Sequence, residues 1–242
     1  MLKPLRFRGF AGPERLRYVA AMANPPISAV LFDLDGTLID SVRLILDSFR
    51  HTCLAHGLPV REEAECLAGI GIPLRVVFRT WTDDPAEQER LMQTYREYNL
   101  EHHDRSVAVY PGAAEMVRLI RGSGLRTGLV TSKNRQGAIR GLRLAGIADE
   151  IEVVVGADDV ENPKPHPEPV LMACRHLEIT PERTVYVGDS VHDMASGRAA
   201  GTRTAAALWG PFVRGDLERS QPDHWLERPE DLLEMLGLGP RA

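Results

Sequence analysis

An acidic motif that directly follows an apolar run constrains this chain more than any other feature. Residues 27–31 are apolar or small, and they lead into Phe32-Asp33-Leu34-Asp35-Gly36-Thr37-Leu38. An apolar run that ends at a glycine turn predicts a buried strand, here over residues 27–33, with two carboxylates at its tip. Two such charges about 4 Å apart repel by roughly 4 kcal/mol at an effective dielectric constant near 20. We therefore expect a cationic group beside Asp33 and Asp35.

The second half of the chain alternates between strand and helix patterns. Apolar runs predict strands over residues 125–131, 151–155, 184–187 and 203–208, and a short strand near Trp225. Helical periodicity predicts helices over residues 113–121, 134–144, 167–176, 192–200 and 229–236. Strands that alternate with helices of this length are typical of a parallel sheet covered on both faces. We therefore expect an α/β core domain, doubly wound, built from residues 27–40 and 108–242.

Residues 41–107 contain no convincing strand pattern. Their periodicity predicts helices over residues 41–56, 62–67, 74–81 and 84–103. This helical insertion follows the first strand, and open α/β sheets bind ligands at the carboxyl ends of their strands. We therefore expect residues 41–107 to form a helical cap domain over the site.

Composition excludes several other classes of protein. The chain has 242 residues, of which 43% are hydrophobic and 26% charged, as in ordinary globular proteins. The formal net charge of -5 does not indicate the excess of basic residues that is typical of nucleic-acid-binding proteins. Three cysteines without a CxxC pair argue against a disulfide framework or a zinc site, and no apolar run approaches the roughly 20 residues of a membrane span. We therefore expect a cytoplasmic protein without a nucleic-acid or membrane partner.

The first 26 residues differ in composition from the rest of the chain. They carry five basic residues, Lys3, Arg6, Arg8, Arg15 and Arg17, against the single acid Glu14. A transit peptide would share this bias, but the segment lacks the apolar stretch of a secretory signal. We interpret residues 1–26 as a weakly packed basic leader, with translation from Met22 as an alternative. Residues 1–22 are then expected to be dispensable for stability and turnover.

Four polar segments follow predicted strands and should meet at one edge of the sheet. They are residues 33–37, the pair Thr131-Ser132, residues 162–167 and residues 188–193. Asp33 and Asp189 offer hard oxygen ligands of the kind that Mg²⁺ prefers. Thr131 and nearby backbone N–H groups can hold phosphate oxygens at a helix N-terminus. Together the segments predict a site for phosphate and a divalent metal.

Lysine is rare in this chain, which makes Lys164 informative. The only lysines are at positions 3, 133 and 164, and Lys164 lies between two prolines that stiffen its backbone. A compact ammonium group suits a position beside a carboxylate and a phosphate. We therefore expect Lys164 to be the cation of the site.

With these four motifs in this order, the chain resembles the haloacid dehalogenase-like (HAD) hydrolase superfamily. The resemblance covers nearly everything from Ile27 onward and is strongest to the phosphoglycolate-phosphatase-like branch with a small helical (C1-type) cap. It implies a Rossmann-like sheet in the order 3-2-1-4-5, in which Asp33 and Asp189 end neighbouring strands.

The resemblance also implies roles for the first motif. Asp33 would be the nucleophile that forms an aspartyl-phosphate. Asp35 would be the general acid for the leaving group and then the base that activates water, and its backbone carbonyl would bind Mg²⁺. The acid role requires Asp35 to be protonated when substrate binds, so we expect neighbouring acids to raise its pKa.

The other motifs receive binding roles from the same resemblance. Thr131 and Lys164 would bind the phosphoryl group, with Ser132 beside them, and Lys164 would also orient Asp33. Asp189 would bind Mg²⁺ directly. Asp193 would hold either a metal-bound water or Lys164.

Several further residues are weaker candidates. Gly69-Ile70-Gly71 follows no strand and is therefore not a dinucleotide loop, but Gly71, Ile72 and Arg75, with Pro73 and Leu74, could recognise the substrate. A plain interhelical loop is equally compatible. The run at 102–104 indicates a solvated helix end more than a metal site, because adjacent histidines do not share a helix face. His166 and His192 flank motif positions and could line the entrance.

The expected function is Mg²⁺-dependent hydrolysis of a small phosphomonoester, such as phosphoglycolate or a sugar phosphate. An inorganic pyrophosphatase is a serious alternative, because residues 95–99 and 102–104 are similar to that subgroup, and a β-phosphoglucomutase-like sugar phosphomutase is a weaker one. The absence of lysine from residues 41–107 argues against a phosphonate hydrolase, and the presence of Asp35 argues against a dehalogenase. The intact pair of acids also argues against a purely regulatory module. We expect a small phosphorylated metabolite as the partner, and a monomer or homodimer.

Overall fold

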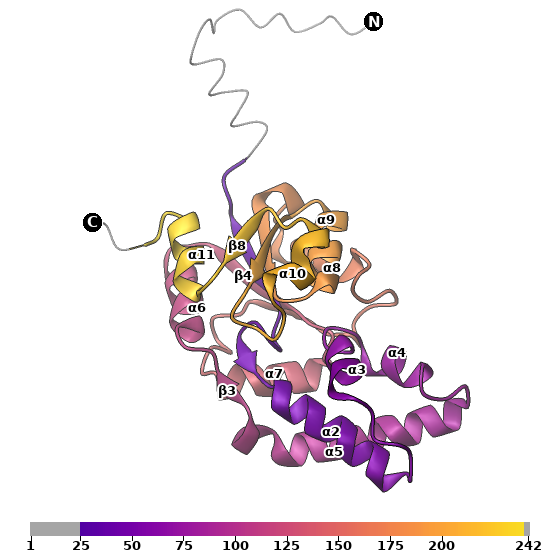
Figure 1. Cartoon of the computed structure of the whole chain (residues 1–242). Coiled ribbons are helices and arrows are strands. Elements are labelled where there is room, and N and C mark those ends of the chain that lie inside the picture. Colours follow the sequence, from indigo (N-terminus) through magenta and orange to yellow (C-terminus); the bar gives the residue numbers. More distant parts are fainter. Residues whose placement is uncertain (1–24, 240–242) are drawn as a thin grey trace, which may run out of the picture.

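The computed structural model describes residues 25–239, and a parallel sheet runs through its larger part (Figure 1). Its strands are β1 (Ala29–Phe32), β4 (Arg126–Val130), β5 (Val153–Val155), β6 (Thr184–Gly188), β7 (Arg203–Ala207) and β8 (His224–Leu226). They lie in the order β5-β4-β1-β6-β7-β8, and every neighbouring pair is parallel. The predicted order 3-2-1-4-5 is confirmed, and the strand expected near Trp225 adds a sixth member at the edge.

Side-chain alternation along β1 divides the core into two layers. Val30 and Phe32 belong to an apolar cluster that includes residues of α6 (Ala113–Gly122), α7 (Arg135–Leu144) and α11 (Pro229–Met235). Ala29 and Leu31 belong to a second cluster with residues of α8 (Glu168–Leu177) and α9 (Val191–Ala200). Because successive residues of a strand point to opposite faces, a fully apolar β1 has to be covered by helices on both sides. The predicted α/β class is confirmed.

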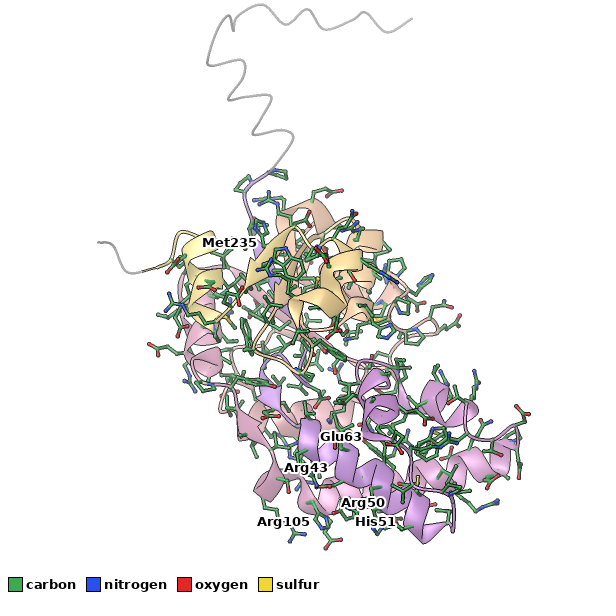
Figure 2. The ribbon with its side chains drawn as sticks, viewed as in Figure 1. Arg43, Arg50, His51, Glu63, Arg105 and Met235 are labelled. Carbon is green, nitrogen blue, oxygen red and sulfur yellow. The ribbon has the colours of Figure 1, made fainter. Side chains whose placement is uncertain are left out.

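The helical insertion, residues 41–107, lies beside the sheet as a group of helices (Figure 1). These are α2 (Val42–Ala55), α3 (Glu63–Ala68), α4 (Leu74–Arg79) and α5 (Pro85–Ser106). α5 begins as predicted, with Pro85 in its first turn and the Asp84 side chain accepting a hydrogen bond from the Ala86 N–H at 2.9 Å. Figure 2 shows the side chains of the helical insertion, with Arg43, Arg50 and His51 labelled on α2.

A separate apolar cluster fills the helical insertion. Phe49, Phe78, Leu91 and Tyr95 are buried in it. The insertion joins the sheet through two short antiparallel strands, β2 (Ile39–Asp40) and β3 (Ala108–Val109). The sequence did not indicate these strands, because two residues are too few to show a period. That residues 41–107 form a separate cap domain stays a prediction. A separate domain needs an apolar core of its own, and this cluster supplies one.

Several smaller differences separate the expected elements from the observed ones. α5 continues to Ser106, three residues beyond the predicted end, and a short helix, α10 (Arg214–Leu217), had not been expected. Within residues 25–239, no helix is both long and apolar enough to cross a membrane. The expectations for residues 1–22 lie outside the described residues.

Replacing Phe49 by Ala should destabilise the helical insertion strongly. The Phe49 side chain is only 2% exposed, and its ring centroid lies 4.8 Å from that of Tyr95 and 5.9 Å from that of Phe78. Removing a buried Phe side chain typically costs about 3–5 kcal/mol in the free energy of unfolding. Urea titration followed by circular dichroism measures this. Leu54→Ala, on the same helix but 62% exposed, is the matched control and should change stability by less than about 0.5 kcal/mol. Equal effects of the two changes would contradict the packing described here.

Candidate active site

Asp33 and Asp189 lie side by side because β1 and β6 are paired in parallel. Phe32 is in register with Val187, and the Asp33 N–H donates to the Val187 carbonyl at 2.8 Å. The two carboxylates follow their strands directly and are 3% and 1% exposed, respectively. With Asp193, they place three carboxylate oxygens within 4.8 Å of one another. The sheet therefore brings together the two acids that the sequence assigned to one metal.

Lys164 is the cation predicted for these acids. Its Nζ lies 3.0 Å from Asp33 Oδ1 and 2.6 Å from Asp193 Oδ1, and the side chain is buried. Burial by itself favours the neutral amine, but the charges of Asp193 and Asp33 outweigh it and raise the Lys164 pKa above its usual range. The two neighbouring carboxylates therefore favour the charged form of Lys164.

Asp193 is engaged on both oxygens by protein groups. Oδ1 meets Lys164 Nζ and lies 2.8 Å from the Tyr186 hydroxyl. Oδ2 accepts from the backbone N–H and the hydroxyl of Ser190 at 3.0 and 2.5 Å, in a capping box that starts α9. A carboxylate has about four acceptor positions. Of the two roles predicted for Asp193, the geometry therefore favours holding Lys164 over holding a metal-bound water.

Asp33 and Asp189, by contrast, keep oxygens available for a cation. Asp189 Oδ1 accepts from the Thr37 hydroxyl at 2.8 Å, whereas its buried Oδ2 has no hydrogen-bond partner among residues 25–239. Burial raises the pKa of Asp33 to about 7, although Lys164 acts in the opposite direction. Burial and the charges of Asp193 and Asp33 likewise raise the pKa of Asp189. Two buried acids, of which Asp189 has an unpartnered oxygen, form a donor set that a hard divalent cation fits.

Asp35 forms an ion pair that the sequence analysis did not foresee. Lys133 Nζ lies 2.8 and 3.0 Å from the two Asp35 oxygens, and the Ser41 hydroxyl donates to Oδ1 at 2.5 Å. Burial alone would raise the Asp35 pKa, but the Lys133 charge and these hydrogen bonds outweigh it and lower the pKa below its usual value. The prediction that neighbouring acids raise this pKa is wrong, because it left out Lys133. The rarity of lysine, together with its position directly after Thr131-Ser132, was the available signal.

The loop predicted to bind phosphate lies between β4 and α7. Thr131 is buried at the tip of β4, and its hydroxyl accepts from the Lys133 N–H at 3.2 Å. Asn134 caps α7 by accepting from the Gly137 N–H at 3.1 Å. Ser132 donates its hydroxyl to the Gly71 carbonyl at 2.6 Å. Thr131 therefore lies at the tip of β4, where the sequence predicted it, whereas Ser132 connects this loop to the helical insertion.

Gly71 brings the helical insertion directly against two of the motif loops. Its φ of +83° is left-handed, and a Cβ added there would lie 2.9 Å from Ser190 Oγ and 3.6 Å from His192 Cδ2. Only glycine meets both requirements without strain. The loop at 69–73 therefore touches the segment after β4 and the segment after β6 at once.

A cavity of about 510 Å³ lies between the helical insertion and the motif loops. Asp33, Asp35, Thr131 and Lys133 line it on one side. The helical insertion lines it with the predicted recognition residues and with further polar and apolar side chains: Gly71, Ile72, Arg75, Arg96, Asn99, Ile45, Phe49 and Met92. The cavity therefore has a charged end at the carboxylates and an apolar wall.

The three histidine predictions have different outcomes. His192 is half-buried beside Gly71, at the edge of the site. His166 is exposed, and its Nδ1 accepts from the Glu168 N–H at 3.2 Å, in the turn that precedes α8. His103 is only 1% exposed, so the expected solvated helix end is wrong at this position. Asp104 accepts two hydrogen bonds from Arg140 of α7 and tethers the end of α5 there, which buries the adjacent His103.

Comparison with known proteins identifies the family. The family model described as haloacid dehalogenase-like hydrolase matches residues 30–207. The chain belongs to the haloacid dehalogenase-like hydrolase family. The resemblance stated from the motifs is thereby confirmed, and with it that this protein is an enzyme, a HAD phosphatase.

Curated relatives and solved structures extend the HAD match over most of the chain. Proteins named pyrophosphatase PpaX from Anoxybacillus flavithermus and Bacillus pumilus are each 41% identical to it, over 89% of this chain and 99% of their own length. A solved HAD-like family hydrolase from Streptococcus pneumoniae has a TM-score of 0.75 at 26% identity and covers 86% of this chain and 98% of its own. A proposed phosphoglycolate phosphatase from Lactobacillus plantarum has a TM-score of 0.77 at 26% identity, covering 87% and 99%.

Gly71→Ala should impair turnover more than a matched change elsewhere. Gly57 also has a positive φ, +65°, but no atom lies within 4 Å of a Cβ placed there. Both changes cost the roughly 1–2 kcal/mol of a left-handed alanine, but only Gly71→Ala also pushes against Ser190. We expect kcat/KM for an aryl phosphate with Mg²⁺ to fall about ten-fold or more for Gly71→Ala and to stay unchanged for Gly57→Ala. Similar kinetics of the two variants would show that the loop contact is unimportant for the reaction.

Proposed function

We propose that this protein is a Mg²⁺-dependent pyrophosphatase that works through an aspartyl-phosphate on Asp33. The curated relatives named pyrophosphatase support this choice of substrate, because they align over nearly their whole length. The observation that carries it is the position of Lys133, whose ammonium group bridges both oxygens of Asp35 inside the cavity.

Lys133 matters because of where the leaving group has to be. A leaving oxygen that departs beside Asp35 is also close to Lys133, so the second phosphoryl group of pyrophosphate would meet an ammonium group. A phosphate leaving group keeps its negative charge and needs little protonation, unlike an alkoxide. An Asp35 carboxylate paired with lysine therefore suits an anhydride substrate better than an alkyl ester.

In the proposed first step, a carboxylate oxygen of Asp33 attacks the nearer phosphorus atom. The bond from phosphorus to the bridging oxygen breaks, and its electron pair leaves with the second phosphate toward Lys133. Lys164 and Thr131 hold the transferring phosphoryl oxygens, whose charge is spread in the transition state. Asp193 keeps Lys164 in place from the opposite side.

In the proposed second step, Asp35 acts as a base. Its carboxylate takes a proton from the water that attacks phosphorus. The bond from phosphorus to the Asp33 oxygen then breaks, which restores the Asp33 carboxylate and releases the phosphoryl group that Asp33 carried as phosphate. Asp35 already lies in the carboxylate form that this step uses.

A Mg²⁺ ion fits the donors described above. Asp33, Asp189 and the backbone carbonyl of Asp35 would hold it, and its charge would offset that of the phosphoryl oxygens.

A small organic phosphomonoester is the second candidate substrate. The cavity volume of about 510 Å³ falls in the range of sites for organic ligands, and Ile45, Phe49 and Met92 give it an apolar wall. Phosphoglycolate is one such ester, and it is what one of the solved relatives is proposed to hydrolyse.

A comparison of substrates separates the two candidates. The purified protein with Mg²⁺ should release phosphate from pyrophosphate with a kcat/KM at least about ten-fold above that for phosphoglycolate or a sugar phosphate. EDTA should abolish the activity on every substrate, because Asp33, Asp189 and phosphate then repel one another, and added Mg²⁺ should restore it. A preference for an organic ester would favour the second candidate, and full activity in EDTA would contradict the metal.

Replacing each of the two acids of the first motif should block a different step of the reaction. Asp33→Asn removes the proposed nucleophile, so neither turnover nor a phosphoenzyme should be detected. Asp35→Asn keeps the nucleophile but removes the base, which is typically worth about 10²–10⁴ in rate. Mass spectrometry should therefore find phosphate trapped on Asp33 in the Asp35→Asn variant. A label on position 35 in the Asp33→Asn variant would show that the two roles are reversed.

Lys133 should determine the preference for pyrophosphate. Lys133→Met removes the charge beside the leaving group, so kcat/KM for pyrophosphate should fall about 10²-fold, with a loss at least about ten-fold smaller for phosphoglycolate. Lys133→Arg keeps a cation and is the matched control, which should retain more activity on pyrophosphate than Lys133→Met. An equal loss on both substrates would assign Lys133 to the general machinery or to the fold.

A further inference from the structure

The loop that follows β7 also reaches the metal-binding edge of the sheet, yet none of the roles above uses it. It comprises residues 208–213, and this segment separates β7 from α10. Trp209 lies against the main core cluster, and Phe212 packs against the apolar cluster of the helical insertion. The loop thus extends from the sheet to the helical insertion and passes Asp189 on the way.

Trp209 is connected to Asp189 through Thr37. The indole Nε1–H of Trp209 donates to the Thr37 backbone carbonyl at 2.9 Å. The Thr37 hydroxyl in turn donates to Asp189 Oδ1 at 2.8 Å. Asp189 Oδ2 is left buried and without a hydrogen-bond partner among the described residues. The connection therefore fixes which Asp189 oxygen is occupied and which is free.

Gly210 holds the same carboxylate from the other side. A Cβ added at Gly210 would lie 2.5 Å from the Gly36 carbonyl oxygen and 2.8 Å from Asp189 Cβ. A Cβ added at Gly36, whose φ is +85°, would clash with Asp189 Oδ2. Contacts this short leave no space for a side chain at either position, so only glycine fits on these two sides of Asp189.

We infer that Trp209 and Gly210 are positioning residues that hold Asp189 with its free oxygen directed at a divalent cation. This inference rests on the proposed metal site. Groups that orient a metal ligand without touching the metal commonly change metal affinity about ten-fold or more when they are lost. Trp209 and Gly210 act through Thr37 and Gly36 in this way, so their first effect should be on metal binding.

The role of Trp209 is tested by removing only the hydrogen bond that its indole N–H donates to the Thr37 carbonyl. Trp209→Phe keeps an aromatic ring against the core and loses the N–H donor. Trp225→Phe is the matched control, because Trp225 is also half-buried but lies on β8, and its indole makes no hydrogen bond toward Asp189 within residues 25–239. Calorimetric titration with Mg²⁺ alone should show a dissociation constant raised about three- to ten-fold for Trp209→Phe, as expected for one lost hydrogen bond, and unchanged for Trp225→Phe.

The Gly210 arm is tested by adding one methyl group. Gly210→Ala should weaken Mg²⁺ binding by at least about ten-fold, because the Gly36 carbonyl or Asp189 has to move. Gly215→Ala is the matched control, since no atom lies within 4 Å of a Cβ at Gly215. The shift of the melting temperature on adding Mg²⁺ gives a second readout and should shrink only in the Gly210 and Trp209 variants. Should Gly210→Ala fail to fold, Trp209→Phe decides alone.

The outcomes separate this inference from the proposed metal site. If the unaltered protein does not bind Mg²⁺, the metal site itself is wrong. If the unaltered protein binds Mg²⁺ and Trp209→Phe binds it equally well, the positioning role is wrong. Equal weakening by Trp209→Phe and Trp225→Phe would also overturn it, because the effect would then come from the loss of an indole anywhere in the fold.

Discussion

Lys164 forms buried ion pairs with both Asp33 and Asp193 at the carboxyl edge of the sheet. An isolated carboxylate in such a place would be protonated or would destabilise the fold. One ammonium group offsets only part of the charge of Asp33, Asp189 and Asp193, and the pKa values of Asp33 and Asp189 remain raised. The fold therefore holds acids in a state that a divalent cation and a phosphate would complete, which is a cost in stability placed where the chemistry is proposed to occur.

The other lysine in the described part of the chain, Lys133, has a separate task. Lys164 faces the proposed nucleophile, whereas Lys133 faces Asp35, the proposed base. Two acids that lie two residues apart therefore have different environments: burial raises the pKa of Asp33, and Lys133 lowers that of Asp35. Different environments for two neighbouring titratable groups are a common basis for dividing catalytic roles.

The helical insertion and the sheet meet through loops that also carry the site. Ser132 donates to Gly71, Gly71 lies against Ser190, and Phe212 packs into the apolar cluster of the helical insertion. The first two contacts involve Ser132 and Ser190, which are next to the proposed phosphate ligand Thr131 and the proposed metal ligand Asp189. A movement of the helical insertion would therefore displace those ligands through direct contacts and would not need a rearrangement of the core.

The sequence by itself determined the α/β class and the residues that gather at the sheet edge, and the resemblance of its motifs to a known family implied the strand order. Apolar runs and helical periods are local signals, and parallel pairing then places Asp33, Thr131, Lys164 and Asp189 at one edge. The tertiary structure alone decided the pairing of Lys133 with Asp35, the burial of His103, and the approach of Gly71 and Gly210 to the motif loops. These contacts join residues far apart in the chain. They depend on side-chain directions and loop paths that no spacing pattern encodes, and a single such contact was enough to reverse the expected pKa of Asp35.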